Sequence, residues 1–296
     1  MTTMSERRTD RAVASASRRS RRRSRRSIPL TVLAAAIGLV FIVPAVWIFA
    51  GSVRPSTELF ASFSTLGWGI LVPGTVSFDN YAQLLSNGFA VSLLNSLVVC
   101  LGTVLIGLVM TALAAYALAV LRFPARNAAF AIVVISFMVP FEAIAIPLSQ
   151  QFADWNLTNT FIGLILPGIG NGLAIFNLRQ FFLSVPSSLR EAAILDGAGE
   201  PRILFSVYLP TSGGALANTA LLLFLGQWGS YLWPLLVVTD QSMQMAPVAL
   251  AKTVSEHATN YGQNFAGVIL LTLVPAVLML FLQRYFTAST MAGVER

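Results

Sequence analysis

Few side chains of this 296-residue chain are of the types that carry out catalysis or bind metal ions. The single cysteine, Cys100, and the single histidine, His257, leave too few ligands for a usual zinc site. A phosphate-binding P-loop needs a lysine after a glycine, whereas the only lysine, Lys252, follows Ala251. We therefore expect no catalytic residue, no metal ion and no cofactor bound by this chain, which is predicted not to be an enzyme.

A charged, amphipathic stretch between Ser187 and Pro210 interrupts the apolar second half of the chain. Ser188 followed by Glu191 is a capping-box pattern, which predicts that a helix begins there with Pro186 just outside it. Glu191 is therefore expected to act as a cap and as a surface contact, not as an acid or base. The stretch is predicted to be a contact surface for another protein.

The first helix of this stretch is predicted to carry a face of little side-chain bulk. Ala193 and Gly197 lie four residues apart, so another protein surface would approach the backbone closely. Gly197, Gly199 and Pro201 then predict a break in the helix, and a second short helix should stop at Pro210.

An aromatic stripe in a later apolar run is a candidate substrate pathway. Phe224, Trp228 and Tyr231 recur at four and three residues and share a helix face, with Gln227 beside them. Aromatic faces stack on the apolar faces of sugars, and an amide bonds their hydroxyls. Core packing or an interfacial aromatic belt is the alternative interpretation.

Two polar residues in other apolar runs are further pathway candidates. Glu142 lies between Pro140 and Pro147, and we expect it towards the outer end of its span. It either lines an exit for solute or reaches interfacial water. Asn95 is a pathway candidate too, although a buried amide in a bundle more often joins neighbouring helices.

The elements that position these residues are predicted to be membrane helices. Hydrophobic residues make up 56% of the chain and charged residues 10%, and the uncharged runs exceed the roughly 20 residues of one crossing. The fold class is therefore an all-α membrane protein with six transmembrane helices in a domain spanning 28–296. Their approximate ranges are 28–52, 89–121, 127–149, 160–183, 213–239 and 262–286, with prolines at 140, 147, 167, 234 and 275 predicting kinks.

An arginine-rich segment, residues 1–27, precedes the first span. Ten of the nineteen basic residues lie in the first 26 positions, which predicts a disordered cytoplasmic tail that anchors topology. Nucleic-acid binding and a twin-arginine export signal are the alternatives. The uncharged run that follows, Ser27 to Val53, is too long for a signal-peptide core and is expected to remain as a membrane helix.

The distribution of basic residues predicts the orientation of the chain. With the N-terminus inside, seventeen of the nineteen basic residues fall in inner segments, and only Arg54 and Lys252 fall outside. Both termini and the loop between spans four and five, residues 184–212, are therefore expected to be cytoplasmic.

That loop also carries a resemblance to a known family. It reads Glu191-Ala192-Ala193, three residues, Gly197, nine residues, Val207, one residue and Leu209-Pro210. This pattern resembles the EAA signature of the permease subunits of bacterial binding-protein-dependent ABC importers. We call residues 184–212 the EAA loop. The resemblance implies that it docks on the ATPase subunit through a set of residues: Glu191, Ala192, Ala193, Asp196, Gly197, Ala198, Leu209 and Pro210.

Shorter pieces are similar to the carbohydrate-uptake branch of this family. They are RPSTELF from Arg54, FDNY from Phe78, AAYALAVLRFPAR from Ala114 and LQRYF from Leu282. With them the resemblance extends over nearly all of the chain from Ser27 onward and is greatest to the second permease of maltose-transporter type.

The resemblance implies a non-catalytic subunit of the bacterial inner membrane with several partners. These are a second permease in a heterodimer, a cytoplasmic ATPase dimer that holds ATP and Mg²⁺, and an extracytoplasmic solute-binding protein. The expected substrate is a carbohydrate or polyol, and no nucleic acid is expected. The alternatives are a secondary transporter or channel that acts without an ATPase, an ABC permease for a non-sugar solute, and a membrane scaffold without transport activity.

Overall fold

The computed structural model describes residues 29–55, 59, 74–254 and 260–291, with side chains up to residue 283. All regular elements in this part are helices, and it contains no strand, which confirms the predicted all-α class. The arginine-rich segment 1–27, predicted as a cytoplasmic tail, lies outside the described residues.

Up to six candidate membrane spans are present, as many as the sequence predicted. Three helical runs are long and apolar enough to cross a membrane: Pro29–Ser52, Asp79–Ala119 and Tyr261–Gln283, of which the second is kinked at Gly88, whose φ is 92°. The other candidates are pairs of shorter helices that meet at bends of 94°, 45° and 87°. The predicted spans 127–149 and 160–183 are therefore assembled from two helices each. The third pair joins the predicted loop to the predicted span 213–239, in which the helix ends at Trp228 and a short helix follows at Leu232–Val237.

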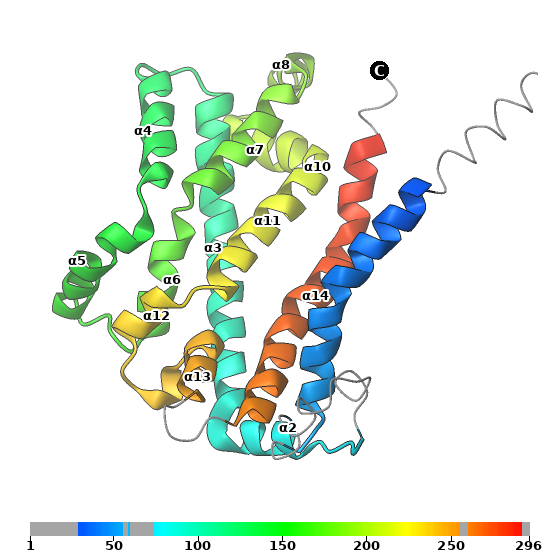
Figure 1. The fold of residues 1–296 in the computed structure, drawn as a ribbon. Coiled ribbons are helices and arrows are strands. Elements are labelled where there is room, and N and C mark those ends of the chain that lie inside the picture. Colours follow the sequence, from blue (N-terminus) through cyan, green and yellow to red (C-terminus); the bar gives the residue numbers. More distant parts are fainter. Residues whose placement is uncertain (1–28, 56–58, 60–73, 255–259, 292–296) are drawn as a thin grey trace, which may run out of the picture.

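The elements after the first helix, Pro29–Ser52, follow in chain order (Figure 1). They are α2 (Asp79–Leu84), the π-turn η3 (Leu85–Phe89), α3 (Ala90–Ala119), α4 (Arg126–Met138), α5 (Phe141–Asp154), α6 (Phe161–Ile169), α7 (Gly172–Ser184), α8 (Ser187–Leu195), α9 (Glu200–Ile203), the π-turn η4 (Leu204–Tyr208), α10 (Leu209–Thr211), α11 (Gly213–Trp228), α12 (Leu232–Val237), the 3₁₀ turn η5 (Gln241–Met243), α13 (Ala246–Lys252) and α14 (Tyr261–Met291).

Helix α3 is the central element of the bundle. It packs against α6, α7 and α11, and small or hydroxyl side chains such as Ser96, Thr103 and Ala115 are buried along it. Small residues let neighbouring backbones approach closely in membrane proteins. Helix α14 packs against α11 and α2, and the first helix lies beside α14, where Trp47 and Phe265 meet edge to face at 5.0 Å (Figure 1).

The predicted span 127–149 is not one continuous helix. It consists of α4 and most of α5, which meet at a bend of 94°. The residue before a proline is driven out of the helical region, and Val139 has an extended ψ of 123°. Pro140 also has no N–H to continue the helical ladder. The proline therefore turns α5 sharply away from α4.

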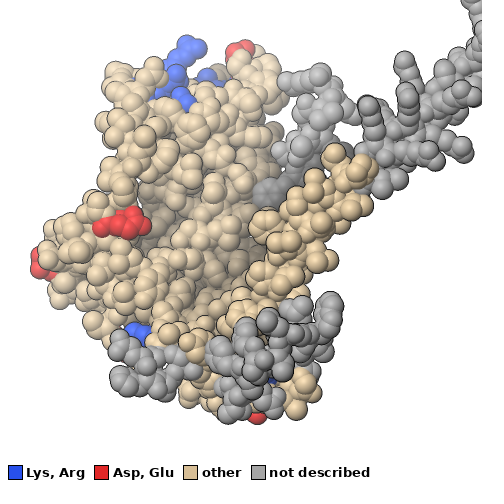
Figure 2. Space-filling view, viewed as in Figure 1, with Lys and Arg blue, Asp and Glu red and all other residues tan. Residues whose placement is uncertain are grey.

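The ends of several elements gather at one end of the molecule. The start of the first helix, the last turns of α14 and helix α8 all lie there (Figure 1). Charged side chains cluster at the two ends, whereas the middle of the visible face is largely uncharged, apart from two acidic groups on the left, one beside the start of α5 and one at the left edge (Figure 2). This division into polar ends and an apolar middle is that of a membrane-spanning bundle.

Candidate functional site

Two regions of the described chain hold the predicted functional residues. The first is the EAA loop, at the end of the molecule that also carries the connection from α3 to α4 (Figure 1). The second is a cavity of about 530 Å³ that is lined by the start of α5, by α6 and by the end of α11.

Helix α8 ends in a Schellman motif formed by the residues of the EAA pattern. Gly197 has a φ of 77°, in the left-handed region, and its N–H donates to the carbonyl of Ile194 at 2.9 Å. The N–H of Ala198 donates to the carbonyl of Ala193, also at 2.9 Å. These are the two hydrogen bonds that define the motif, so the position of Gly197 in the pattern has a backbone reason.

The start of α8 differs from the prediction. The helix begins at Ser187 with Pro186 as its N-cap, and no side chain donates or accepts a capping hydrogen bond there. The expected capping box of Ser188 and Glu191 is therefore wrong. Pro186 lies just outside the helix, as predicted, but Ser188 lies inside the first turn and not at the N-cap position, so its side chain does not cap the helix.

The small-residue face of α8 also lies differently from the expectation. Ala193 and Ala198 are half-buried against a hydrophobic core cluster of this chain that includes Tyr116, Phe182 and Tyr208. Gly197 lies beyond the helix, in the Schellman turn. The small side chains of Ala193 and Ala198 thus bring α8 close to its own bundle.

The outward face of α8 is apolar in part. Leu195 is 88% exposed, and Leu189 and Ile194 are exposed at 44% and 45%. Of the predicted docking residues, four on α8 or at its end and one in α10 are exposed, namely Glu191, Ala192, Asp196, Gly197 and Pro210. Leu209 is half-buried against the same core cluster as Ala193 and Ala198. The loop therefore has an outer contact face and an inner packing face.

The second half of the EAA loop is one continuous helical run, Glu200–Thr211, and does not stop at Pro210. It contains the π-turn η4, where the N–H of Leu209 donates to the carbonyl of Leu204. The wider turn makes room for Pro210, whose ring would clash with a carbonyl of a regular α-turn. The chain then bends by 87° at Ser212 into α11.

A polar cluster joins the EAA loop to α3. The hydroxyl of Tyr116 donates to Glu200 Oε2 at 2.5 Å, and the guanidinium of Arg190 forms an ion pair with Glu200 Oε1. Burial raises the pKa of the Glu200 carboxyl, but the hydrogen bonds from Tyr116 and Arg190 lower it by more, so that it lies below its usual value. Glu200 is therefore held ionised.

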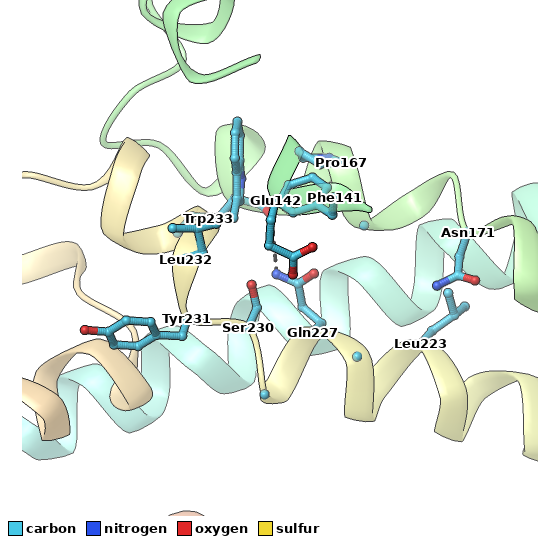
Figure 3. Close-up of a pocket in the computed structure, with 14 residues that line it drawn as sticks. Phe141, Glu142, Pro167, Asn171, Leu223, Gln227, Ser230, Tyr231, Leu232 and Trp233 are labelled. Atoms are coloured by element: carbon cyan, nitrogen blue, oxygen red, sulfur yellow. Dashed lines mark hydrogen bonds between the residues drawn. The ribbon is translucent and has the colours of Figure 1, made fainter. Parts of the chain in front are cut away.

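The cavity brings together three of the predicted pathway residues, Glu142, Gln227 and Tyr231. Figure 3 shows the Glu142 carboxylate, the Gln227 amide and the Ser230 hydroxyl directed towards one another, whereas the Tyr231 ring points away from them. Glu142 is the only Asp, Glu, Lys or Arg among the described residues that line the cavity.

Gln227 is fixed in the cavity wall by its neighbours. Its Nε2 donates to the carbonyl of Leu164 at 3.3 Å, and its side chain is 7% exposed. A Cβ on Gly168 would lie 2.5 Å from Gln227 Oε1, so glycine is required for the amide to lie against α6. The opposite wall is formed by Phe141 and Trp233, whose rings meet edge to face at 5.8 Å.

The other three pathway candidates do not line this cavity. Phe224 and Trp228 are stacked at 5.5 Å and buried with Cys100, and Trp228 Nε1 donates to the carbonyl of Leu271 in α14. Asn95 Nδ2 donates to the carbonyls of Ser242 and Gln244 at 2.8 and 3.2 Å. In this structure Phe224 and Trp228 pack in the core and Asn95 joins neighbouring elements, which are the alternative interpretations that the sequence left open.

Several residues of both regions were missed from the sequence. Tyr116, Arg190 and Glu200 come from three separate elements, and their meeting follows only from the fold. Asn171, which caps α7 through the N–H of Ala174, also lines the cavity. The break at Gly170-Asn171 beside Pro167 was a signal for a polar group at this point. Within the described ranges, no three His, Cys, Asp or Glu side chains converge in a way that would hold a metal ion.

The chain is similar to known transport proteins. A family model described as "Binding-protein-dependent transport system inner membrane component" matches residues 104–291. The chain is 36% identical over 270 residues to the arabinooligosaccharides transport system permease protein AraQ of Halalkalibacterium halodurans, which covers 90% of this chain and 95% of the relative. It is 34% identical over 261 residues to the sn-glycerol-3-phosphate transport system permease protein UgpE of Rhizobium meliloti, covering 84% and 91%.

A solved structure is similar over nearly the same length. It is a chain of a bacterial ABC transporter involved in the import of the acidic polysaccharide alginate. The TM-score is 0.74 at 25% sequence identity, and the match covers 88% of this chain and 96% of the other. The helical arrangement described above is thus similar to that of an importer subunit.

Proposed function

Because the chain belongs to the family of binding-protein-dependent transport system inner membrane components, we propose that it is the permease subunit of a bacterial ABC importer for a carbohydrate. It is a multi-pass protein of the inner membrane. The observation that carries the proposal is the extent of the family match, which includes the EAA loop and every residue that lines the cavity. The carbohydrate assignment rests on the similarity to the arabinooligosaccharide permease.

The ATPase of the importer docks on the outward face of α8 in this proposal. Leu189, Ile194 and Leu195 are exposed apolar side chains of α8, and the side chains of Glu191 and Asp196 are exposed on the same helix or at its end. An apolar centre with charged neighbours is typical of a specific protein interface. The ATPase chains bind ATP together with Mg²⁺ and supply the energy of its hydrolysis. The movement of the ATPase chains is passed to this chain through α8.

The cavity is one half of the solute pathway in this proposal. The Gln227 amide, the Ser230 hydroxyl and the Glu142 carboxylate offer hydrogen-bonding groups for the hydroxyls of a sugar, and Phe141 and Trp233 are aromatic. A second permease completes the pathway, and an extracytoplasmic solute-binding protein delivers the sugar. Closure of the ATPase dimer draws the two docking helices together, and rigid-body movement of the spans opens the cavity outwards.

A charge placed at Leu195 of α8 tests the docking surface. We expect Leu195→Asp to reduce co-purification of the ATPase by at least about tenfold and to abolish uptake of labelled arabinotriose by cells, because a desolvated carboxylate would be left in an apolar interface. Ser187→Asp, an exposed change at the start of the same helix, should behave as the wild-type protein does.

Two outcomes would contradict the proposal. Normal co-purification of the ATPase with Leu195→Asp would show that the ATPase docks elsewhere. Sugar uptake that persists after the ATPase gene is deleted, and that stops when the proton gradient is collapsed, would support a secondary transporter instead. The single carboxylate of the cavity, Glu142, would then be the group to test for proton coupling.

A further inference from the structure

One carboxylate connects three elements at the end of the molecule that bears α8. Glu200 begins α9, Arg190 lies on α8, and Tyr116 lies near the end of α3. The two oxygens of Glu200 are divided between the two partners: Oε2 accepts from the Tyr116 hydroxyl at 2.5 Å, and Oε1 pairs with the Arg190 guanidinium. Arg190 and Glu200 form the only ion pair that the described part of the chain contains.

The polar cluster rests on a rigid aromatic base. The ring of Tyr116 meets Phe182 of α7 and Tyr208 of η4 edge to face, with centroids 6.4 and 5.1 Å apart, and Phe182 meets Tyr208 at 5.4 Å. Edge-to-face contacts of this kind stabilise aromatic pairs beyond the area that they bury. Ile203 and Leu204, from the same loop, are 1% and 3% exposed in this core. The Tyr116 hydroxyl is therefore held in one place relative to the loop.

The covalent connection from the EAA loop to the membrane spans passes through a sharp bend. The helical run Glu200–Thr211 meets α11 at a bend of 87°, and two glycines, Gly213 and Gly214, follow the bend. Glycines give the backbone more freedom than other residues do. A displacement of α8 would therefore be partly absorbed at this joint unless a second connection carried it into the bundle.

We propose that Tyr116, Arg190 and Glu200 form a latch that positions the ATPase-docking helix against α3, so that a displacement of α8 passes directly into α3. This inference rests on the proposed function. Helix α3 packs against α6 and α11, which line the cavity, so the latch connects the docking surface with the solute pathway. The three residues act as positioning residues and contact neither the solute nor ATP.

Removal of a single hydroxyl tests the latch. In the complete transporter, reconstituted in proteoliposomes with its binding protein and arabinotriose, Tyr116→Phe keeps the ring and loses the bond to Glu200. We expect the ATPase to co-purify and hydrolyse ATP within about twofold of the wild-type rate, while the sugar transported per ATP falls about fivefold, as for the loss of one net hydrogen bond. Tyr208→Phe is the matched control, because its ring lies in the same cluster and its hydroxyl has no hydrogen bond within the described part; it should keep the wild-type ratio.

A distance measurement covers the case in which Tyr116→Phe does not transport at all. Spin labels at Ser188→Cys on α8 and Leu113→Cys on α3, both exposed positions, report their separation in a Cys100→Ala background. We expect a narrow distribution with Tyr116 and a broader one with Tyr116→Phe. Equal sugar-to-ATP ratios, or equal distance distributions, for Tyr116→Phe and the wild-type residue would overturn the latch. A wild-type chain that binds no ATPase would instead overturn the proposed function, and the distance distributions would still decide on the latch.

Discussion

Gly197 adopts a backbone conformation that any side chain would strain. Its φ of 77° lies in the left-handed region, and its N–H and that of Ala198 close α8. A Cβ at this position would meet no atom within 4 Å, so the requirement for glycine comes from the backbone and not from space. The residue therefore orients the end of α8 relative to α9.

Two glycine substitutions separate backbone strain from crowding. We expect Gly197→Ala to lower the thermal unfolding midpoint of the detergent-solubilised protein by about 2–4 °C, because a left-handed conformation costs a residue with a Cβ about 1 kcal/mol. Gly199→Ala is the control: its φ of −76° suits alanine, and its Cβ would lie 3.9 Å from Pro201. That variant should unfold at the wild-type temperature or slightly above it. Equal midpoints for the two variants would contradict the strain argument.

The positions of the aromatic residues of α11 show what residue spacing cannot predict. The spacing of Phe224, Trp228 and Tyr231 predicted a shared helix face with Gln227 beside it. Phe224, Gln227 and Trp228 are buried in α11, but Tyr231 lies beyond the end of that helix, before α12, so the prediction was wrong for Tyr231. Periodicity identifies a face but not the neighbour that covers it. Gln227 meets the cavity and α6, whereas Phe224 and Trp228 meet Cys100 and α14. That division depends on which helices flank α11, and this information is not local in sequence.

Helices α3, α8 and α9 are tied together by one ionised side chain, and this connection depends on pH. The pKa of Glu200 is lowered by its two hydrogen bonds, so its contribution to stability is complete above the pKa of the unfolded chain, about 4.3, and is lost as the pH falls through the folded value. We expect Glu200→Gln to lower the thermal midpoint by about 2–4 °C near pH 7. The difference from wild type should shrink below about pH 4. A difference that stays constant over this range would show that the charge of Glu200 contributes nothing.

Prolines predicted kinks in the spans but not which of them would end a helix. Pro140 separates α4 from α5, whereas Pro147, Pro167 and Pro275 lie inside α5, α6 and α14. A proline removes one N–H in every case, but the resulting bend depends on which neighbours satisfy the freed carbonyls. The 94° turn after α4, which places Glu142 at the cavity, therefore could not be predicted from the sequence and is seen only in the structure.

For the molecule as a whole, composition and hydropathy led to the all-α class and to the number of candidate spans. The family resemblance came chiefly from the EAA loop. The residue spacing there reflects a local motif, the Schellman turn, that does not depend on distant parts of the chain. The cavity and the Tyr116–Glu200 contact join residues more than eighty positions apart. Long-range contacts of this kind cannot be predicted from local sequence patterns.

The orientation of the bundle is the last expectation, and the arrangement of its ends makes it testable. Helix α8 and η5 lie at opposite ends of α3 (Figure 1), and Ser188 and Gln241 are exposed there. Cys100 is fully buried, so single cysteines at these sites in a Cys100→Ala background can be labelled selectively. A membrane-impermeant maleimide should label Gln241→Cys in intact spheroplasts and Ser188→Cys only in inverted vesicles from cells that lack the ATPase, because the distribution of basic residues predicts that the α8 end is cytoplasmic. Labelling of Ser188→Cys from outside would reverse the orientation and would remove α8 from the reach of any cytoplasmic ATPase.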